Sequence, residues 1–487
     1  MNINVPSAKI FFWKGAVLAG GALLVLLILP VLFSCSTGPA ETVKPVPERP
    51  EEAPEELPPL TDTQSILARM AVLLDRGDYD GALELFDLID AVEAESVGIR
   101  LLKASVLSSA GRLTEARAIA EDISSKEPSN LEALFVLSAI EGASGKEREQ
   151  RTILERIIKI DPANPEALSA LGTIALRARS LRTAASYFDR ALAAEPDNQE
   201  ALIGRAGVYR YDRDPKNAEA LLNKAVTLYP QWAVPYSERA RLYQEAGFPK
   251  EALADLDRAK ALDGGDYWIA VDRGTILIDL NRKPEALEEF TRAIALDPSS
   301  FLAYVYSAGI KDELGDYDGA ERDYETLSKL KPEYYFAFEG LGMHKMRRGL
   351  WAEARDAFLE AYKQAPQESV YALLAAMNWM RAGRPNEPRQ FLEQALRGVQ
   401  RESLEWYMFR LYHDLSGDTD VAIRIDREQN TVTKARMLYY LANYYDIRGN
   451  KNLADKYFLQ VQDLNQKATV EWRLNEWALE QRNLKAY

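Results

Sequence analysis

The sequence is poor in the residues that build disulfides, metal sites and nucleophilic active sites. Among its 487 residues there is one cysteine, Cys35, and there are two histidines, His344 and His413. A single thiol cannot form a disulfide within the chain, and these few side chains cannot supply a Cys/His metal framework. We therefore expect no metal and no cofactor, and a folded part that is stabilised by helix packing alone.

Motifs of catalysis are missing as well. The sequence has no glycine-rich phosphate loop, no HExxH pattern and no Ser-His-Asp set, and its two histidines lie in distant segments. His344 stands beside Lys345 and Arg347, and we interpret it as a solvated surface residue. The sequence predicts a protein that is not an enzyme, without catalytic residues and without a small-molecule substrate.

An excess of positive charge is also lacking. The chain has 60 lysines and arginines against 74 aspartates and glutamates, which gives a formal net charge of −14. A protein that binds a phosphate backbone needs clustered lysines and arginines. Nucleic acid is therefore not an expected partner.

The N-terminal segment differs from the rest of the chain. Lys9 and Lys14 precede an apolar run, Gly15–Phe33, and the only thiol, Cys35, lies where the sequence turns polar. A basic start followed by an apolar stretch is typical of a secretory or membrane signal. Residues 1–35 resemble a bacterial lipoprotein signal peptide that ends at its lipid-modified cysteine.

This resemblance implies lipid attachment at Cys35 and a lipoprotein held in the bacterial cell envelope. The expected location is the periplasmic side, and outer-membrane attachment or surface display stays open. A run as long as Gly15–Phe33 can also just span a bilayer. The alternative is therefore a single-pass membrane protein with an uncleaved N-terminal anchor.

Residues 36–62 have the composition of a tether. Between residues 36 and 60 there are seven prolines and six glutamates, which leave almost nothing apolar to bury. Proline-rich chain extends by about 3 Å per residue, so this segment can reach roughly 75 Å. We predict a disordered spacer over 36–62.

From residue 63 onward the sequence repeats every 34 residues. The repeat is marked by prolines that can end a helix, with a glycine in place of one of them. These marks are Pro128, Pro162, Pro196, Pro230, Gly264, Pro298, Pro332 and Pro366. Within each unit, small and bulky side chains recur at fixed positions, and apolar residues follow the i, i+3, i+4, i+7 spacing of two amphipathic helices.

This pattern resembles the tetratricopeptide repeat, a 34-residue helix–turn–helix unit. One unit shows it in Gly342, Gly349, Ala354, Phe358 and Pro366. The resemblance implies an all-α, right-handed superhelical solenoid of about twelve units over 63–468, followed by a capping helix over 469–487. The units are expected to start at residues 63, 97, 131, 165, 199, 233, 267, 301, 335, 369, 403 and 435, the eleventh being degenerate.

By resemblance to the family, the first helix of each unit lines a concave groove, and positions 2, 5, 9 and 12 of the unit point into it. A cationic stretch and a stripe of methionines and aromatics fall on or beside these positions. The candidate partner-binding residues are Arg210, Arg241, Trp268, Phe336, Met343, Met346, Met377, Met380 and Tyr407. Methionines and aromatics suit the apolar faces of partner segments, but packing between repeats is an equally open interpretation.

The expected function is that of a non-catalytic, lipid-anchored scaffold. The concave groove would bind a protein or peptide partner and support the assembly of an envelope complex, an expectation based on the fold. A surface-exposed adhesin that binds host or extracellular ligands is the alternative. If the methionine stripe is a partner surface, it should be solvent-exposed in the free protein.

Overall fold

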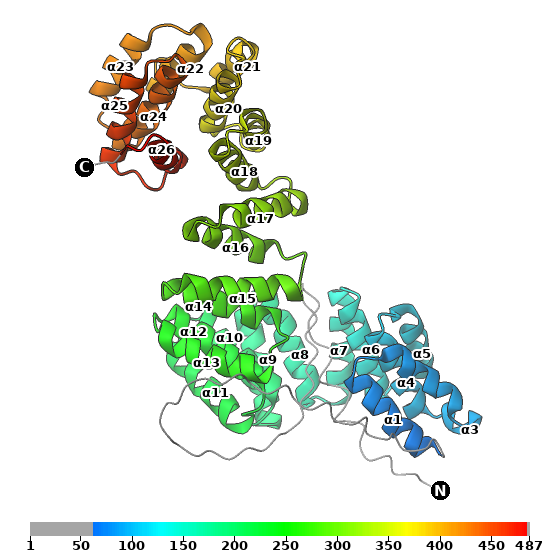
Figure 1. The fold of residues 1–487 in the computed structure, drawn as a ribbon. Helices are drawn as coiled ribbons and strands as arrows, with labels where there is room; N and C mark the ends of the chain where they lie inside the picture. Colours follow the sequence, from blue (N-terminus) through cyan, green and yellow to red (C-terminus); the bar gives the residue numbers. More distant parts are fainter. Residues whose placement is uncertain (1–61, 485–487) are drawn as a thin grey trace, which may run out of the picture. The chain divides into compact units, whose positions relative to one another are not determined.

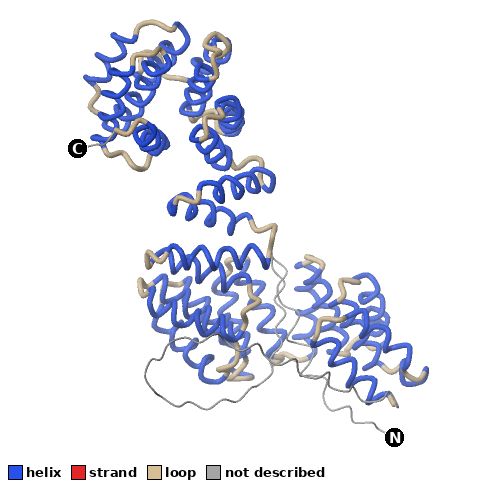
Figure 2. The backbone as a smooth tube through the Cα atoms, viewed as in Figure 1, coloured by secondary structure: helices blue, strands red, loops and turns tan. Residues whose placement is uncertain are grey.

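The described part of the protein is entirely helical. A computed structural model describes residues 62–484, which form 26 α-helices and two short 3₁₀ helices with no β-strand (Figure 1, Figure 2). The chain divides into two compact units after Ile276, and each unit is described by itself. The predicted signal peptide, Cys35 and all but the last residue of the predicted tether lie outside the described residues.

The first unit holds thirteen helices and the start of a fourteenth. They are α1 (Thr63–Asp75), α2 (Tyr79–Glu84), α3 (Ala91–Ala94), α4 (Val97–Ser109), α5 (Leu113–Lys126), α6 (Leu131–Ala143), α7 (Glu147–Ile160), α8 (Pro165–Arg177), α9 (Leu181–Ala194), α10 (Gln199–Tyr211), α11 (Pro215–Leu228), α12 (Ala233–Glu245), α13 (Pro249–Leu262) and α14 (Tyr267–Asp279). A 3₁₀ helix, Leu85–Leu88, follows α2 directly.

The second unit holds the remaining helices. They are α15 (Lys283–Leu296), α16 (Phe301–Leu314), α17 (Tyr317–Leu330), α18 (Tyr335–Arg347), α19 (Trp351–Gln364), α20 (Ser369–Arg381), α21 (Arg389–Ala395), α22 (Leu404–Asp414), α23 (Asp418–Arg427), α24 (Thr431–Ile447), α25 (Lys451–Leu464) and α26 (Val470–Gln481). A 3₁₀ helix, Leu396–Gly398, follows α21.

Helix boundaries follow from local chemistry. Asn130, Asn164 and Asn198 each precede a first helix, and their side-chain oxygens accept a hydrogen bond from the backbone N–H three residues on. The turn between the two helices of a unit needs a left-handed residue, which is often glycine, as at Gly247 with φ 79°. These signals recur every 34 residues, and nine first helices begin at the expected positions 97 to 369.

The repeat packing depends on small residues beside aromatic rings. A Cβ built on Gly172 would lie 2.7 Å from the ring of Phe188, so only glycine fits at this helix contact. Phe188 itself is fully buried, as are the equivalent Phe290 and Phe358. The predicted all-α array of paired helices is confirmed.

The last units depart from the regular repeat. The second helices α21 and α23 are short, with 7 and 10 residues, whereas α24 has 17 residues and begins at Thr431, four residues before the expected start. The capping helix α26 ends at Gln481, and its Leu474 and Trp477 are buried, as a capping helix requires.

The long helix α24 and the final helix α26 turn back against earlier repeats of the same unit. Tyr440 of α24 donates a hydrogen bond from its hydroxyl to the carbonyl oxygen of Val370, 3.3 Å away, at the start of α20. Trp477 of α26 packs edge-on against Tyr317, with ring centroids 5.4 Å apart. Figure 1 shows α26 beside α18. The inner faces of α18 and α20 are therefore covered by the chain's own C-terminal helices.

No helix between residues 62 and 484 combines the length and the apolar character that crossing a membrane requires.

Candidate partner-binding site

The four methionines that were candidates for an exposed groove are buried. Met343, Met346, Met377 and Met380 have relative exposures between 0% and 7%. They belong to one apolar core together with side chains of α24 and α26, which cover the inner faces of α18 and α20. The prediction that a binding stripe would be solvent-exposed is therefore wrong for these four residues. Their burial favours the interpretation that they pack between repeats.

The three aromatic candidates are more accessible than the methionines. Trp268, in the first unit, is 37% exposed, and Phe336, in the second unit, is 45% exposed. Tyr407 is half-buried, and the guanidinium of Arg424 lies 3.7 Å from the centre of its ring. Of the three, Phe336 lies at a cavity, which is described below.

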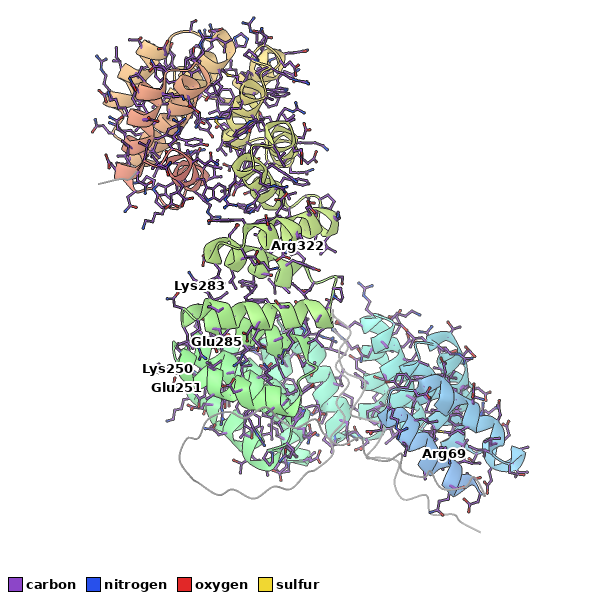
Figure 3. The ribbon with its side chains drawn as sticks, viewed as in Figure 1. Arg69, Lys250, Glu251, Lys283, Glu285 and Arg322 are labelled. Carbon is purple, nitrogen blue, oxygen red and sulfur yellow. The ribbon has the colours of Figure 1, made fainter. Side chains whose placement is uncertain are left out.

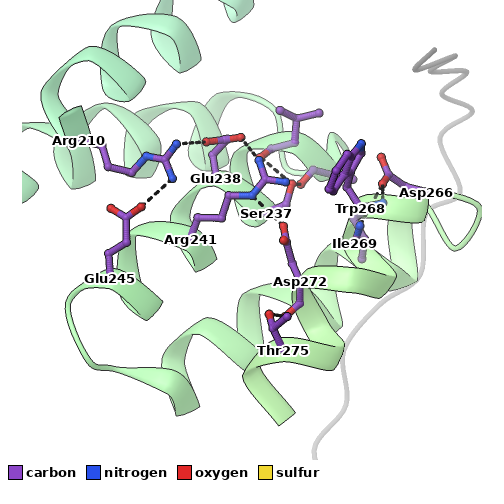
Figure 4. Close-up of polar contacts among 12 residues, drawn as sticks. Arg210, Ser237, Glu238, Arg241, Glu245, Asp266, Trp268, Ile269, Asp272 and Thr275 are labelled. Atoms are coloured by element: carbon purple, nitrogen blue, oxygen red, sulfur yellow. Dashed lines mark hydrogen bonds and ion pairs between the residues drawn. The ribbon is translucent and has the colours of Figure 1, made fainter. Parts of the chain in front are cut away.

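The two candidate arginines are paired with acids of neighbouring helices (Figure 4). Arg241 of α12 lies 2.7 Å from Asp272 of α14 and also pairs with Glu238 on its own helix. Arg210 of α10 lies 3.1 Å from Glu245 and 3.9 Å from Glu238. These side chains form a ladder of ion pairs across α10, α12 and α14, so the predicted cationic stretch is wrong: it is neutralised from within the chain.

Arg241 and Asp272 of this ladder have perturbed pKa values. Burial alone would lower the pKa of Arg241, but Glu238 and Asp272 raise it well above its ordinary value. Burial raises the pKa of the Asp272 carboxyl, although Arg241 opposes this shift. Arg241 therefore stays charged, and the ladder holds the three first helices in register.

A cavity of about 280 Å³ opens in the second unit among α16, α17, α18 and α26. Most of its lining comes from the first helices α16 and α18, with one arginine from the final helix. The lining residues are Val305, Gly309, Asp312, Tyr324, Leu327, Tyr334, Phe336, Glu339, Gly340, Met343 and Arg473. Six of them occupy groove positions of their units: Val305, Gly309, Asp312, Phe336, Glu339 and Met343.

Asp312 is the most densely contacted acid of this cavity. Its carboxylate accepts a hydrogen bond from the Tyr324 hydroxyl at 2.8 Å and lies 3.2 Å from the guanidinium of Arg473. His344 Nε2 lies 2.8 Å from the other carboxylate oxygen.

Because His344 is buried, the interpretation of this residue as solvated surface is wrong. Burial, with Asp312 beside it, raises the pKa of Tyr324 well above its ordinary value, so its hydroxyl remains a donor.

Glu339 is the second acid of the cavity, and its surroundings differ. Its carboxylate accepts one hydrogen bond, from the Tyr371 hydroxyl at 2.6 Å. Among residues 62–484, no lysine or arginine forms an ion pair with it. Burial raises the pKa of the Glu339 carboxyl, because removal from water disfavours its charged form.

Sequence reasoning missed this cavity because it searched the groove positions for lysines, methionines and aromatics. The available signal was the presence of two acids, Asp312 and Glu339, at groove positions among apolar neighbours. No group of three or more His, Cys, Asp or Glu side chains in the described part of the chain could hold a metal ion.

Two models of one family match the chain. Both are described as tetratricopeptide repeat, and they cover residues 73–139, 169–231, 237–301 and 311–369, together about half of the sequence. The chain belongs to the tetratricopeptide-repeat family. In this family's terms, the cavity lies on the concave side of the repeats that start at 301 and 335.

Several solved tetratricopeptide-repeat structures are similar to parts of this one. A tetratricopeptide-repeat protein from Parabacteroides merdae has 19% identity and a TM-score of 0.41, over 50% of this chain and 96% of that chain. A thermophilic one from Thermus thermophilus has 22% identity and a TM-score of 0.34, over 37% and 98%. Pseudomonas aeruginosa pilF has 18% identity and a TM-score of 0.38, over 42% and 92%.

These likenesses are too distant to bear on function. No curated protein matches the chain.

Proposed function

We propose that this tetratricopeptide-repeat protein is a non-catalytic scaffold that binds a protein or peptide partner on the concave side of its second unit. The observation that supports this most directly is the cavity whose lining residues occupy groove positions of two consecutive repeats. Phe336 stands at this cavity with nearly half of its surface exposed, so its ring is accessible to a partner there. The family's usual role in protein binding agrees with this proposal.

The rest of the concave side is less suited to a partner. The methionines of α18 and α20 are covered by the C-terminal helices, and Arg210 and Arg241 are engaged in ion pairs. The partner surface proposed here is therefore centred on Phe336 and the cavity beside it, and of the methionine stripe it includes only Met343, which lines that cavity.

A photo-crosslinking amino acid at position 336 is expected to capture a discrete partner in intact cells. The same amino acid at Arg322, an exposed residue on the second helix α17 (Figure 3), is the matched control and should capture none. The measurement is the appearance of crosslinked bands and their identification by mass spectrometry. Equal crosslinking from both positions, or none from position 336, would refute a concave partner surface at this cavity.

We also propose that the scaffold is attached to the bacterial cell envelope by a lipid on Cys35, and that it supports assembly of an envelope complex there. The support is the basic start, the apolar run and the position of the only thiol in the sequence. Residues 36–62 would then hold the repeats away from the membrane surface.

Cys35→Ala is expected to abolish labelling with a radioactive fatty acid and to block signal cleavage. Only Cys35 offers a thiol for the lipid, and stable anchoring needs more than one acyl chain. Labelling followed by gel electrophoresis measures both effects at once. A wild-type protein that never takes up the label would instead favour the uncleaved membrane anchor.

A further inference from the structure

The cavity beside Phe336 has two acids, of which, in the part of the chain that the structure describes, Asp312 forms an ion pair with the chain's own residues and Glu339 does not. Asp312 receives the guanidinium of Arg473 from the final helix α26, so a cation of the protein itself already occupies that end. Glu339, on the next repeat, has the Tyr371 hydroxyl as its one hydrogen-bond partner within the described part of the chain. The guanidinium and the His344 imidazole both lie against Asp312, so among residues 62–484 Glu339 is the acid of the lining that has no ion pair.

The same cavity has room for a side chain and a wall that suits a cation. A Cβ built on Gly309 would meet no atom within 4 Å, so the space in front of this helix position is open. Tyr334 and Phe336 form an aromatic pair with centroids 5.5 Å apart. Aromatic faces attract ammonium and guanidinium groups, and their apolar surface also packs against the methylene stem of lysine or arginine.

We propose that this cavity is a specificity pocket for a lysine or arginine side chain of the partner peptide, with Glu339 as the residue that pairs with its charge. The inference rests on the proposed scaffold function and adds the chemistry of the partner. An acidic side chain does not fit the same observations, since it would place a further carboxylate beside Glu339 and Asp312, and a neutral one would leave Glu339 without an ion pair. A carboxylate would in addition have to compete with Asp312 for Arg473.

The test uses a pool of peptides of random sequence, which does not require the partner's own sequence. The immobilised full chain is incubated with the pool, and the bound peptides are sequenced. For the wild type we expect lysine and arginine to be enriched about tenfold at one position, the selectivity of a hydrogen bond to a charged group. Absence of basic enrichment at every position would overturn the proposal.

Two variants assign any enrichment to the pocket. Glu339→Gln keeps an oxygen that accepts the Tyr371 hydrogen bond but removes the charge, so basic enrichment should disappear. Gly309→Leu fills the open space and should abolish selection of a long side chain while supporting the helix, because leucine is a better helix former than glycine. Gly98→Leu is the matched control, since Gly98 of α4 also faces open space and lies in the first unit.

The outcomes separate this inference from the scaffold function. If lysine and arginine are still enriched in the peptides bound by both pocket variants, the preference for basic side chains arises at another site and the proposal is wrong. Crosslinking from position 336 in cells without any basic enrichment would leave the scaffold standing and remove only the cation pocket. If N-acetyl-argininamide alone binds as tightly as the enriched peptides, the pocket is a receptor for small cations and the peptide assignment is wrong.

Discussion

Replacing Met343 and Met377 together by glutamate is expected to lower the free energy of unfolding of the second unit by more than about 4 kcal/mol. Met377 is fully buried and Met343 almost so, and both belong to the apolar core that α24 and α26 close. Each substitution removes apolar contacts and places a carboxylate in this core, and at position 343 the new carboxylate joins Asp312 and Glu339 around a single arginine, Arg473. Urea denaturation followed by circular dichroism measures the loss, and it should appear as an early transition because repeats are stabilised mainly by their neighbours.

The control for this experiment is Met377→Leu, which keeps volume and hydrophobicity and should cost less than about 1.5 kcal/mol. The glutamate variants would behave differently if the methionines formed a partner surface. Stability would then stay within about 0.5 kcal/mol of wild type, as for surface substitutions, and crosslinking from position 336 would be lost. That pair of results would contradict the burial described here.

The regular part of the fold could be predicted from the sequence because its determinants are local. A proline that ends one helix, an asparagine that caps the next and a glycine in the turn all act within a few residues, and they recur with the repeat. Asn164 and Gly172 show this, one at the start of α8 and the other at its contact with Phe188. Such signals locate helices and their pairing without knowledge of distant segments.

The burial of the methionine stripe could not be predicted in this way, because it depends on contacts between distant repeats. Arg381 of α20 pairs with Asp446 of α24 at 2.9 Å, 65 residues along the chain. The 34-residue pattern is weakest between these helices, where α21 and α23 are short. A groove predicted from the regular repeats therefore leaves out the segment from α21 to α24, whose sequence departs from the repeat.

His344 shows the same limit at the level of one residue. Its neighbours Lys345 and Arg347 are charged, and this suggested a solvated face. A helix turns by about 100° per residue, so adjacent residues point in different directions. Lys345 instead pairs with Glu321 at 2.6 Å, whereas His344 points to Asp312 of the preceding repeat and packs near Trp477 of α26.

The candidate site was missed for a related reason. Asp312 and Glu339 are each unremarkable in the sequence, since acids are common and usually exposed. Their importance arises only when two repeats and the final helix enclose them, which burial and the raised pKa of Glu339 reveal. A search for acids at groove positions, with no basic residue one repeat away, would have found them.

In the first unit, Arg241→Ala is expected to lower the free energy of unfolding by about 2 kcal/mol, since breaking a partly buried ion pair leaves the partner charge without compensation. Asp272 and Glu238 would then lie close together beneath the concave surface, and the already raised pKa of Asp272 would rise further. The loss should therefore be smaller at a pH low enough to protonate Asp272. Urea denaturation at two pH values measures both effects.

The double variant Arg241→Met with Asp272→Leu distinguishes a structural ladder from a binding surface. Removing both members of the pair should recover most of the stability lost in Arg241→Ala, because apolar side chains of similar volume can replace a buried ion pair. If Arg241 instead serves to attract an acidic partner, Arg241→Ala would leave stability nearly unchanged. It would also weaken partner capture by a photo-crosslinking amino acid placed at position 268, where the native Trp268 is exposed. The pairing of Arg241 with two acids in the free protein favours the first outcome, since a guanidinium engaged on both sides has little left to offer a ligand.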